Sequence, residues 1–281
     1  MRGGLLAYRE RNGKANTISS EDTLFAPVFS KFGLELIDEI KQLHPYPVLL
    51  LGDTGWGKTI LAKEIARQQG LSYLAINGRY ALDTGKLLGF MRPVSTVAGI
   101  SLIWQDGLLT KAVKEGYIFL FEEFTRTPEE NKSILYSILD SVNRSLSIPE
   151  AGIDSIPIHT SFQLIATANP PKAGYTTNRL DIALESRFEA IYEINEPLAD
   201  EDTILATYIE DADIRERYTN FVADLRGKQQ VAYPTRDFVR ILRLYTKGFT
   251  ILRALEIAMA SRNGNVWDGI AQLYEAHFGG M

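Results

Sequence analysis

One short segment of the chain has the residue types and spacing that bind phosphate. Residues 52–59 match the pattern G-x-x-x-x-G-K-[ST] and are Gly52, Asp53, Thr54, Gly55, Trp56, Gly57, Lys58 and Thr59. Glycines let the backbone N–H groups converge on phosphate oxygens, and a following helix directs its positive end at the same anion. Lys58 then reaches the β- and γ-phosphates, and the Thr59 hydroxyl holds Mg²⁺. The spacing predicts a phosphate-binding loop for a nucleoside triphosphate.

The residues on either side of this loop predict a strand and a helix. Residues 46–51 form an apolar run that is typical of a buried strand, and residues 57–69 place Ile60, Leu61 and Ile65 on one helical face. Strand, loop and helix in this order are the setting in which the motif binds phosphate. We therefore favour that interpretation over a glycine-rich turn with an exposed lysine.

Polar side chains follow two later apolar runs. Residues 117–121 are large and apolar and are followed by Glu122 and Glu123, while residues 162–168 are followed by Asn169. Hydrolysis of a triphosphate needs an anchor for Mg²⁺, a group that orients or deprotonates water, and a group that positions that water. We assign these roles to Glu122, Glu123 and Asn169, respectively. A glutamate pair is alternatively the solvated end of a strand, but the phosphate loop upstream favours the functional interpretation.

The elements that must position these residues alternate along the chain. Strands are expected at 46–51, 71–76, 117–121, 162–168 and 187–194, and helices at 24–41, 57–69, 107–115 and 128–142. Residues 87–107 show little periodicity and predict a loop or irregular insertion, while residues 147–160 predict a β-hairpin or loop. Beyond Pro197 every period is helical, at 200–210, 213–226, 235–247, 250–262 and 264–278.

This pattern predicts an α/β fold with a second, smaller domain. A parallel sheet of about five strands is expected in a nucleotide-binding domain over residues 24–196. A small all-helical domain follows over residues 197–281, and residues 1–23 form a polar N-terminal segment. With 281 residues, 45% of them hydrophobic, the chain can bury a sizeable core.

Composition excludes several kinds of chemistry. The chain has no cysteine, so it has no disulfide, thiolate metal site or cysteine nucleophile. A net charge of −5 disfavours nucleic acid as a partner. The histidines His44, His159 and His277 are scattered without a metal-binding spacing. No apolar run has the length of a signal-peptide core or a membrane span, so we expect a cytoplasmic protein that does not cross a membrane.

The order of these motifs resembles the AAA+ ATPases, and within them the MoxR clade. The shared order is a phosphate loop, a strand ending in two acids, a strand ending in asparagine, an Arg-Phe motif at Arg187 and Phe188, and a helical domain. The resemblance covers residues 24–278 and implies a P-loop NTPase (AAA+) core with a helical lid. It implies the Walker A motif at Gly52 to Thr59, Walker B at Glu122 and Glu123, sensor 1 at Asn169, the arginine finger at Arg187 and sensor 2 at Arg236.

The resemblance also implies an assembly. An arginine finger acts on a neighbour's nucleotide, so the functional unit is expected to be a ring, as a homo-hexamer. Alternatively, Arg187 is a surface arginine that pairs with Glu185 or Glu189. Arg236 is alternatively a solvated arginine in the first turn of a helix. ATP with Mg²⁺, a client protein and a partner with a von Willebrand A domain complete what the clade implies. Arg126 and Arg144 face a subunit interface or are ordinary surface residues.

Some features depart from the clade or divide it. Walker B usually begins with aspartate, and Glu122 is one methylene longer, which changes the Mg²⁺ geometry. Residues 104–110 resemble CbbQ and NorQ proteins, whereas residues 123–126 resemble GvpN, so the sub-family stays open. Residues 89–93 and 148–156 are the segments that could contact a substrate in a central pore.

Four functions compete. The leading hypothesis is an ATP-driven remodelling motor or chaperone that acts on another protein. A nucleic-acid-associated motor or loader is the second, and a monomeric P-loop kinase or transferase, which would not need Asn169 or Arg187, is the third. The fourth is a scaffold that binds ATP and barely hydrolyses it.

Overall fold

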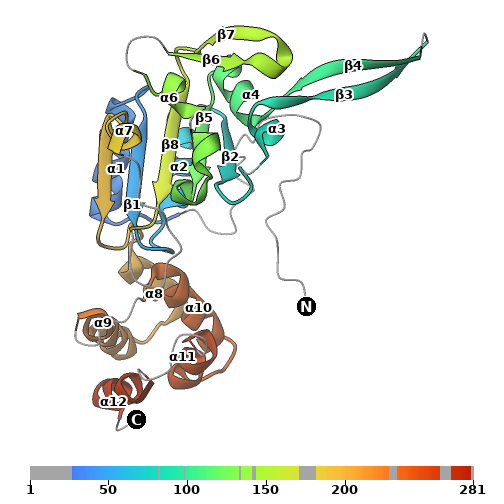
Figure 1. The fold of residues 1–281 in the computed structure, drawn as a ribbon. Helices are drawn as coiled ribbons and strands as arrows, with labels where there is room; N and C mark the ends of the chain where they lie inside the picture. Colours follow the sequence, from blue (N-terminus) through green and yellow to red (C-terminus); the bar gives the residue numbers. More distant parts are fainter. Residues whose placement is uncertain are drawn as a thin grey trace. The chain divides into compact units, whose positions relative to one another are not determined.

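A computed structural model describes residues 27–81, 83–97, 99–132, 134–140, 144–170, 182–227, 233–259 and 267–279 (Figure 1). The polar N-terminal segment predicted at 1–23 lies outside these residues. The chain divides into two compact units. The sheet unit comprises Ile40–Leu49 and Ala62–Ile191, and the helical unit comprises Phe25–Glu39, Leu50–Leu61 and Tyr192–Met281.

The strands that precede the predicted site residues belong to one five-stranded sheet. Its strand order is β2-β5-β8-β1-β9, with bounds β1 Val48–Gly52, β2 Tyr73–Asn77, β5 Ile118–Glu122, β8 Gln163–Ala168 and β9 Ala190–Ile194. Strand β5 is parallel to β2 and to β8, with Ile118 opposite both Tyr73 and Gln163. Every residue of β8 is buried, as is typical of a central parallel strand. The predicted α/β class and all the expected strands are confirmed, with small shifts at their ends.

The helices predicted at 57–69 and 107–115 lie close to their predicted positions, whereas two short helices, α3 and α7, were not predicted. The helix bounds are α1 Lys31–Gln42, α2 Lys58–Gln68, α3 Thr84–Leu87, α4 Leu108–Glu115 and α7 Ile182–Glu185. Helix α4 packs against β2 and β5 through its buried apolar face. The predicted start of the first helix at residue 24 is wrong: α1 begins at Lys31, because the Ser30 hydroxyl accepts from the Gly33 N–H at 3.1 Å and caps the helix.

The helix predicted over residues 128–142 is not continuous. The structure has two four-residue helices instead, α5 Glu129–Lys132 and α6 Leu135–Ile138, and residues 133 and 141–143 lie outside its description. The apolar stripe is real, because Leu135, Ile138 and Leu139 are buried. Periodicity detects such a buried face but not an interruption of the helix between two turns.

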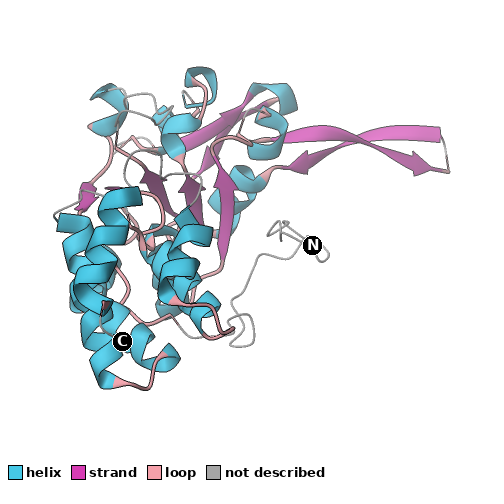
Figure 2. Cartoon of the chain, turned by 90° about the horizontal axis from the view of Figure 1, so that it is seen from below, coloured by secondary structure: helices cyan, strands magenta, loops and turns pink. Residues whose placement is uncertain are grey.

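Residues 87–107 form a β-hairpin, so the prediction of a loop or irregular insertion is wrong. Strands β3 Gly89–Thr96 and β4 Gly99–Asp106 are antiparallel and project from the sheet unit as a long arm (Figures 1 and 2). Neither face of the arm is buried, so the sequence shows no alternation between core and solvent. Pro93 is tolerated because both strands of a two-stranded ribbon are edges.

A second hairpin lies where the sequence predicts a hairpin or loop. Strands β6 Ser145–Ile148 and β7 Ile153–Pro157 pair in antiparallel fashion, with Leu146 opposite Ile156. Unlike the first hairpin, this one has an apolar side that is buried: Leu146, Ile148 and Ile156 are at most 8% exposed. The hairpin is therefore held to the body of the sheet unit by hydrophobic burial.

The helical unit has its own hydrophobic core. Its helices are α8 Glu201–Tyr208, α9 Ala212–Gly227, α10 Thr235–Tyr245, α11 Ile251–Met259 and α12 Trp267–Phe278. Helix α9 packs against α12, and α10 packs against α11. The core includes Tyr218, Phe221, Leu225, Phe238, Ile241, Leu255 and Ile270. Burial raises the pKa of the Tyr218 and Tyr233 hydroxyls, whose oxygens lie 2.8 Å apart, so both stay neutral.

Candidate functional site

The predicted phosphate loop joins β1 to α2 and has the backbone that phosphate binding requires. Gly55 and Gly57 have φ values of +88° and +102°, a region that side chains with a Cβ atom rarely adopt. Lys58 begins α2 and is only 7% exposed. Its Nζ donates to the carbonyl oxygens of Gly52 at 2.6 Å and Asp53 at 2.8 Å, so the lysine lies across its own loop.

The first turn of α10 lies against this loop inside the helical unit. A Cβ atom placed on Gly55 would lie 2.8 Å from Pro234 Cβ and 3.4 Å from Arg236 Cβ. Arg236 is exposed and is the second residue of α10. The structure thus brings the predicted sensor 2 arginine next to the predicted Walker A motif, although 181 positions separate Gly55 from Arg236 in the chain (236 minus 55).

The predicted acids and the asparagine meet at one edge of the sheet. Glu122 ends β5 opposite Asn77, which ends β2. The Glu123 N–H donates to the Thr167 hydroxyl near the end of β8 at 3.3 Å, and the buried Asn169 follows that strand. Parallel strands bring their carboxyl ends to the same edge, so the grouping that we expect from the sequence is present within the sheet unit.

Glu123 has a strained backbone and a charged environment. Its φ and ψ of 50° and 42° are left-handed, which costs a non-glycine residue on the order of 1 kcal/mol or more. Its Oε2 lies 3.2 Å from Arg126 Nη1 and 3.6 Å from Arg79 Nε. The Arg126 Nε is buried without a hydrogen-bond partner among the described residues. The carboxylate of the predicted base therefore faces two guanidinium groups of its own unit.

Arg187 packs within the sheet unit. Its Nη1 donates to the Ala183 carbonyl at 2.7 Å, and its guanidinium lies 4.9 Å from the centroid of the Tyr136 ring. In the described part of the chain, its buried Nε has no hydrogen-bond partner. An arginine that stacks on an aromatic ring is pre-oriented with little loss of side-chain entropy. The arginine-finger role stays a prediction.

Arg144 is half-buried next to α6. Its Nε donates to the Ile138 carbonyl at 3.1 Å, and burial lowers the pKa of its guanidinium. Its Nη2 is buried and, among the residues described, has no hydrogen-bond partner. An interface role for Arg126 or Arg144 stays a prediction.

The donor set fits Mg²⁺ in its chemistry. Thr59, in the first turn of α2, and Glu122, at the end of β5, both offer the oxygen atoms that this ion prefers. The described residues contain no group of three or more His, Asp or Glu side chains that could hold a metal ion by themselves. Mg²⁺ is usually held by one or two carboxylates together with substrate phosphates, so these residues suit an ion that arrives with a nucleotide.

Sequence reasoning missed three residues of this edge, Asn77, Arg79 and Thr167. A polar residue at the end of an apolar strand was the signal used for Asn169, and the same signal marks Asn77 after the strand Tyr73–Ile76. Arg79 carries no such signal, because its contact with Glu123 depends on how the loop after β2 approaches the loop after β5.

Comparison with known proteins defines the class. The family described as AAA domain (dynein-related subfamily) matches residues 47–188. This range contains the phosphate loop, the two glutamates, Asn169 and Arg187. The chain therefore belongs to the AAA domain family, in its dynein-related subfamily.

Three individual proteins are similar to this chain in sequence. Protein NorQ of Paracoccus denitrificans is 27% identical over 90% of this chain and 95% of its own length. The gas vesicle ATPase GvpN of Ancylobacter aquaticus is 30% identical over 44% of this chain and 39% of its own. Midasin of Dictyostelium discoideum is 33% identical over 56% of this chain, which spans only 3% of that relative. The likeness to NorQ and GvpN confirms the predicted resemblance to AAA+ ATPases of the MoxR clade.

A solved structure shares the fold. A mutant RuvB of Thermotoga maritima superposes with a TM-score of 0.50 at 18% identity, over 88% of this chain and 68% of that one. At this identity the likeness shows the fold alone, an AAA+ α/β core with a helical C-terminal part. Within the described residues, no helix has the length and hydrophobicity needed to cross a membrane.

Proposed function

We propose that this protein is an ATP-hydrolysing motor or chaperone that remodels a partner protein. The observation that carries the proposal is the contact between the phosphate loop and α10 at Gly55, which puts the exposed Arg236 beside the Walker A motif. Arg236 and the phosphate loop belong to the same compact unit, so a change at the γ-phosphate would alter the position of α10 against the loop. Hydrolysis would thereby be coupled to movement of α10.

The residues of this chain divide the work of hydrolysis. The loop N–H groups and Lys58 bind the phosphates, and Arg236 adds positive charge that stabilises the transferring phosphoryl group. Glu123 orients or deprotonates the attacking water, an effect worth roughly 10² to 10⁴ in rate, and Asn169 holds that water. Thr59 and Glu122 would hold Mg²⁺, which would supply further positive charge to the phosphates.

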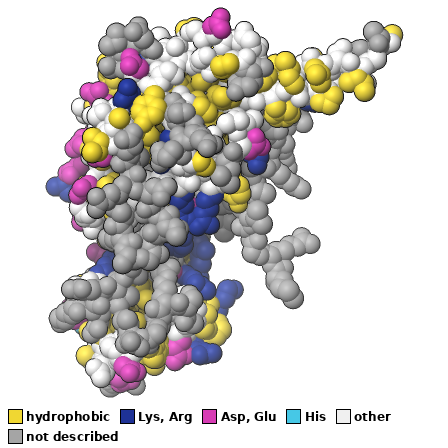
Figure 3. Space-filling view, viewed as in Figure 1, with side chains coloured by type: hydrophobic (Ala, Val, Ile, Leu, Met, Phe, Trp, Pro, Cys, Tyr) yellow, Lys and Arg dark blue, Asp and Glu magenta, His cyan; other side chains and the backbone are white. Residues whose placement is uncertain are grey.

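We propose further that the protein works as a homo-hexameric ring in which Arg187 reaches a neighbour's nucleotide. Membership of the MoxR clade supports a ring, a client protein and a partner with a von Willebrand A domain. The β3–β4 hairpin supports contact with a polypeptide. Its exposed apolar side chains, which gather along the arm in Figure 3, include Phe90, Met91, Ile100, Leu102 and Ile103. The net charge of −5 disfavours nucleic acid as the client.

The test is the ATPase rate per subunit against protein concentration. We expect specific activity to rise with concentration, to fall by about 10² or more in Glu123→Gln with nucleotide binding retained, and to fall disproportionately when wild type is mixed with Arg187→Ala. Glu115→Gln, an exposed acid at the end of α4, is the matched control for loss of a carboxylate. Activity that is flat with concentration, with additive mixing, would overturn the ring and favour a kinase-like site that is complete in one chain.

A second candidate is a scaffold that binds ATP and hydrolyses it very slowly. The observation in its favour is the restraint of Glu123 by Arg126 and Arg79, together with the longer Glu122 in Walker B. It predicts tight nucleotide binding and ring formation with a wild-type rate no higher than that of Glu123→Gln. Single-turnover hydrolysis by the two proteins separates this candidate from the motor.

A further inference from the structure

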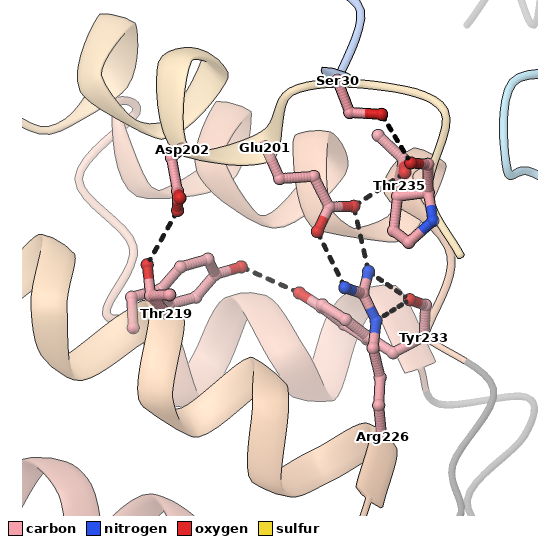
Figure 4. Close-up of polar contacts among 9 residues, drawn as sticks. Ser30, Glu201, Asp202, Thr219, Arg226, Tyr233 and Thr235 are labelled. Atoms are coloured by element: carbon pink, nitrogen blue, oxygen red, sulfur yellow. Dashed lines mark hydrogen bonds and ion pairs between the residues drawn. The ribbon is translucent and has the colours of Figure 1, made fainter. Parts of the chain in front are cut away.

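Arg226 lies at the centre of a polar network in the helical unit (Figure 4). It is in the last turn of α9, and its guanidinium makes a bidentate pair with Glu201 at the start of α8, at 2.8 and 2.9 Å. Its Nε and Nη2 also donate to the Tyr233 carbonyl at 2.9 and 2.7 Å. The side chains of Arg226 and Glu201 are 23% and 13% exposed, so water screens this pair weakly.

The same glutamate holds the beginning of α10. Its Oε1 accepts from the Thr235 hydroxyl at 2.7 Å, and Thr235 is the first residue of α10 (Figure 4). The residue at the N-cap position is Pro234, which has no side-chain cap to offer the helix. A carboxylate near the positive end of a helix is stabilising, so Glu201 supplies from α8 what the local sequence of α10 lacks.

Arg226 also contacts the phosphate loop. Its guanidinium carbon lies 5.9 Å from the centroid of the Trp56 ring and 5.7 Å from that of Tyr233. The Trp56 carbonyl accepts from the Leu198 N–H at 3.1 Å, which ties the loop to the segment just before α8. Trp56 directly follows Gly55, the residue against which Pro234 packs. One guanidinium therefore lies within cation–π range of the loop at Trp56 and is joined through Glu201 to the first turn of α10.

We propose that Arg226 is a positioning residue that sets Arg236 against the phosphate loop and transmits movement of the loop at Trp56 to α10. This inference rests on the proposed ATPase function. Arg226 contacts no nucleotide in this scheme and acts only through its neighbours. The role needs arginine, because a planar fork can make a bidentate pair while its charge lies over an indole ring, whereas the ammonium of lysine is a point charge.

The first test separates positioning from folding. We expect Arg226→Lys and Thr235→Val to lower kcat about tenfold while KM for ATP changes little, because small displacements of a charged group are costly for catalysis. The matched control is Arg217→Lys on the same helix, which alters an ion pair in which Arg217 Nε lies 2.8 Å from Asp213 Oδ2. The control should keep the wild-type kcat. Equal loss of activity in Arg226→Lys and the control would overturn the inference.

A double-mutant cycle tests whether Arg226 acts through Arg236. If it does, Arg226→Lys should cause no further loss of kcat in the Arg236→Ala background, because the group that it positions is already absent. If Arg226 has a merely structural role, the fold-losses of kcat in the two single variants should multiply in the double variant. Multiplicative effects, in proteins with matching melting temperatures, would overturn the inference.

A fluorescence test does not depend on hydrolysis. The chain has three tryptophans, so the full-length variant Trp104→Phe, Trp267→Phe leaves Trp56 as the only indole. We expect ADP with Mg²⁺ to change the Trp56 emission, and Arg226→Lys in this background to reduce that response at least twofold at saturating nucleotide. An unchanged response would overturn the inference. If the wild type binds nucleotide but does not hydrolyse it, the proposed ATPase function fails while this measurement still decides the role of Arg226.

Discussion

Lys58 and Glu123 are the two charges on which the proposed chemistry depends most, and each is held differently within its own unit. Lys58 is 7% exposed and donates to two carbonyl oxygens of its own loop. The side chain of Glu123 is 33% exposed and faces Arg126, three residues later in the same turn, and Arg79, in the loop after β2. Backbone carbonyls are neutral, whereas guanidinium groups carry a full charge.

The difference indicates how each group would respond to a nucleotide. Phosphate oxygens are charged acceptors and form stronger hydrogen bonds with an ammonium than carbonyls do, so Lys58 can exchange its partners at little cost. Glu123 is in an ion pair that must weaken before its carboxylate can take a proton from water. We infer that the loop is ready to bind in this conformation, while the predicted base is restrained.

The largest expected effect comes from removing the loop cation. Lys58→Ala should weaken ATP binding about 100-fold, because charged hydrogen bonds to phosphate are worth roughly 1.5–3 kcal/mol each. Titration with a fluorescent ATP analogue measures the Kd. Lys63→Ala, on the same helix with its Nζ 5.7 Å from the Tyr73 ring centroid, is the control and should bind normally. Binding by Lys58→Ala within threefold of wild type would contradict a nucleotide role for this loop.

A smaller effect, in the opposite direction, is expected from releasing the base. Arg126→Gln should raise basal ATP hydrolysis up to about fivefold, the range expected for one partly exposed ion pair. Arg79→Gln should raise it less, because the Arg79 side chain is 63% exposed and its Nε is 3.6 Å from the carboxylate. Steady-state ATPase rates measure both, with Arg253→Gln, an exposed arginine paired with Glu256, as the control. A fall in rate would show that these arginines assist catalysis and do not restrain Glu123.

The smallest effect concerns the ion pair of Glu64 with Arg67, which lies outside the proposed chemistry. Glu64 on α2 accepts from Arg67 Nε at 2.8 Å, and this hydrogen bond lowers the pKa of Glu64 below its ordinary value, against the opposing effect of burial. A lowered pKa means that the pair stabilises the fold above the ordinary pKa of glutamate, and that this stability is lost as the pH falls through the folded value.

Thermal melts across pH give the corresponding measurement. Glu64→Gln should melt a few degrees below wild type at pH 7, and the two melting temperatures should converge as the pH falls below about 4. Glu35→Gln, which alters an exposed pair with Lys31, should differ little from wild type at either pH. A Glu64→Gln difference that persists unchanged at low pH would show that packing, and not the ion pair, accounts for it.

Local pattern predicted much of the fold and of the site. The loop at 52–59 and the ends of β5 and β8 lie where the sequence places them, because each depends on residues next to one another in the chain. The hairpin at 87–107 was missed for a physical reason: with both faces exposed, its apolar residues show no alternation. The interrupted helix after Pro128 was missed because a stripe of buried residues looks the same in one helix or two.

The sequence by itself determined the phosphate loop, the α/β class and the acidic strand end, since glycine spacing and apolar runs act over a few residues. Arg126 faces Glu123 from three positions along the chain, but only the tertiary structure decided which distant charges face these groups. Arg79 and Glu123 are 44 positions apart, and Arg226 and Glu201 are 25 apart (123 minus 79; 226 minus 201). Such pairs form when separate elements pack together, so no local pattern encodes them. In the proposed scheme they restrain Glu123 and position Arg236.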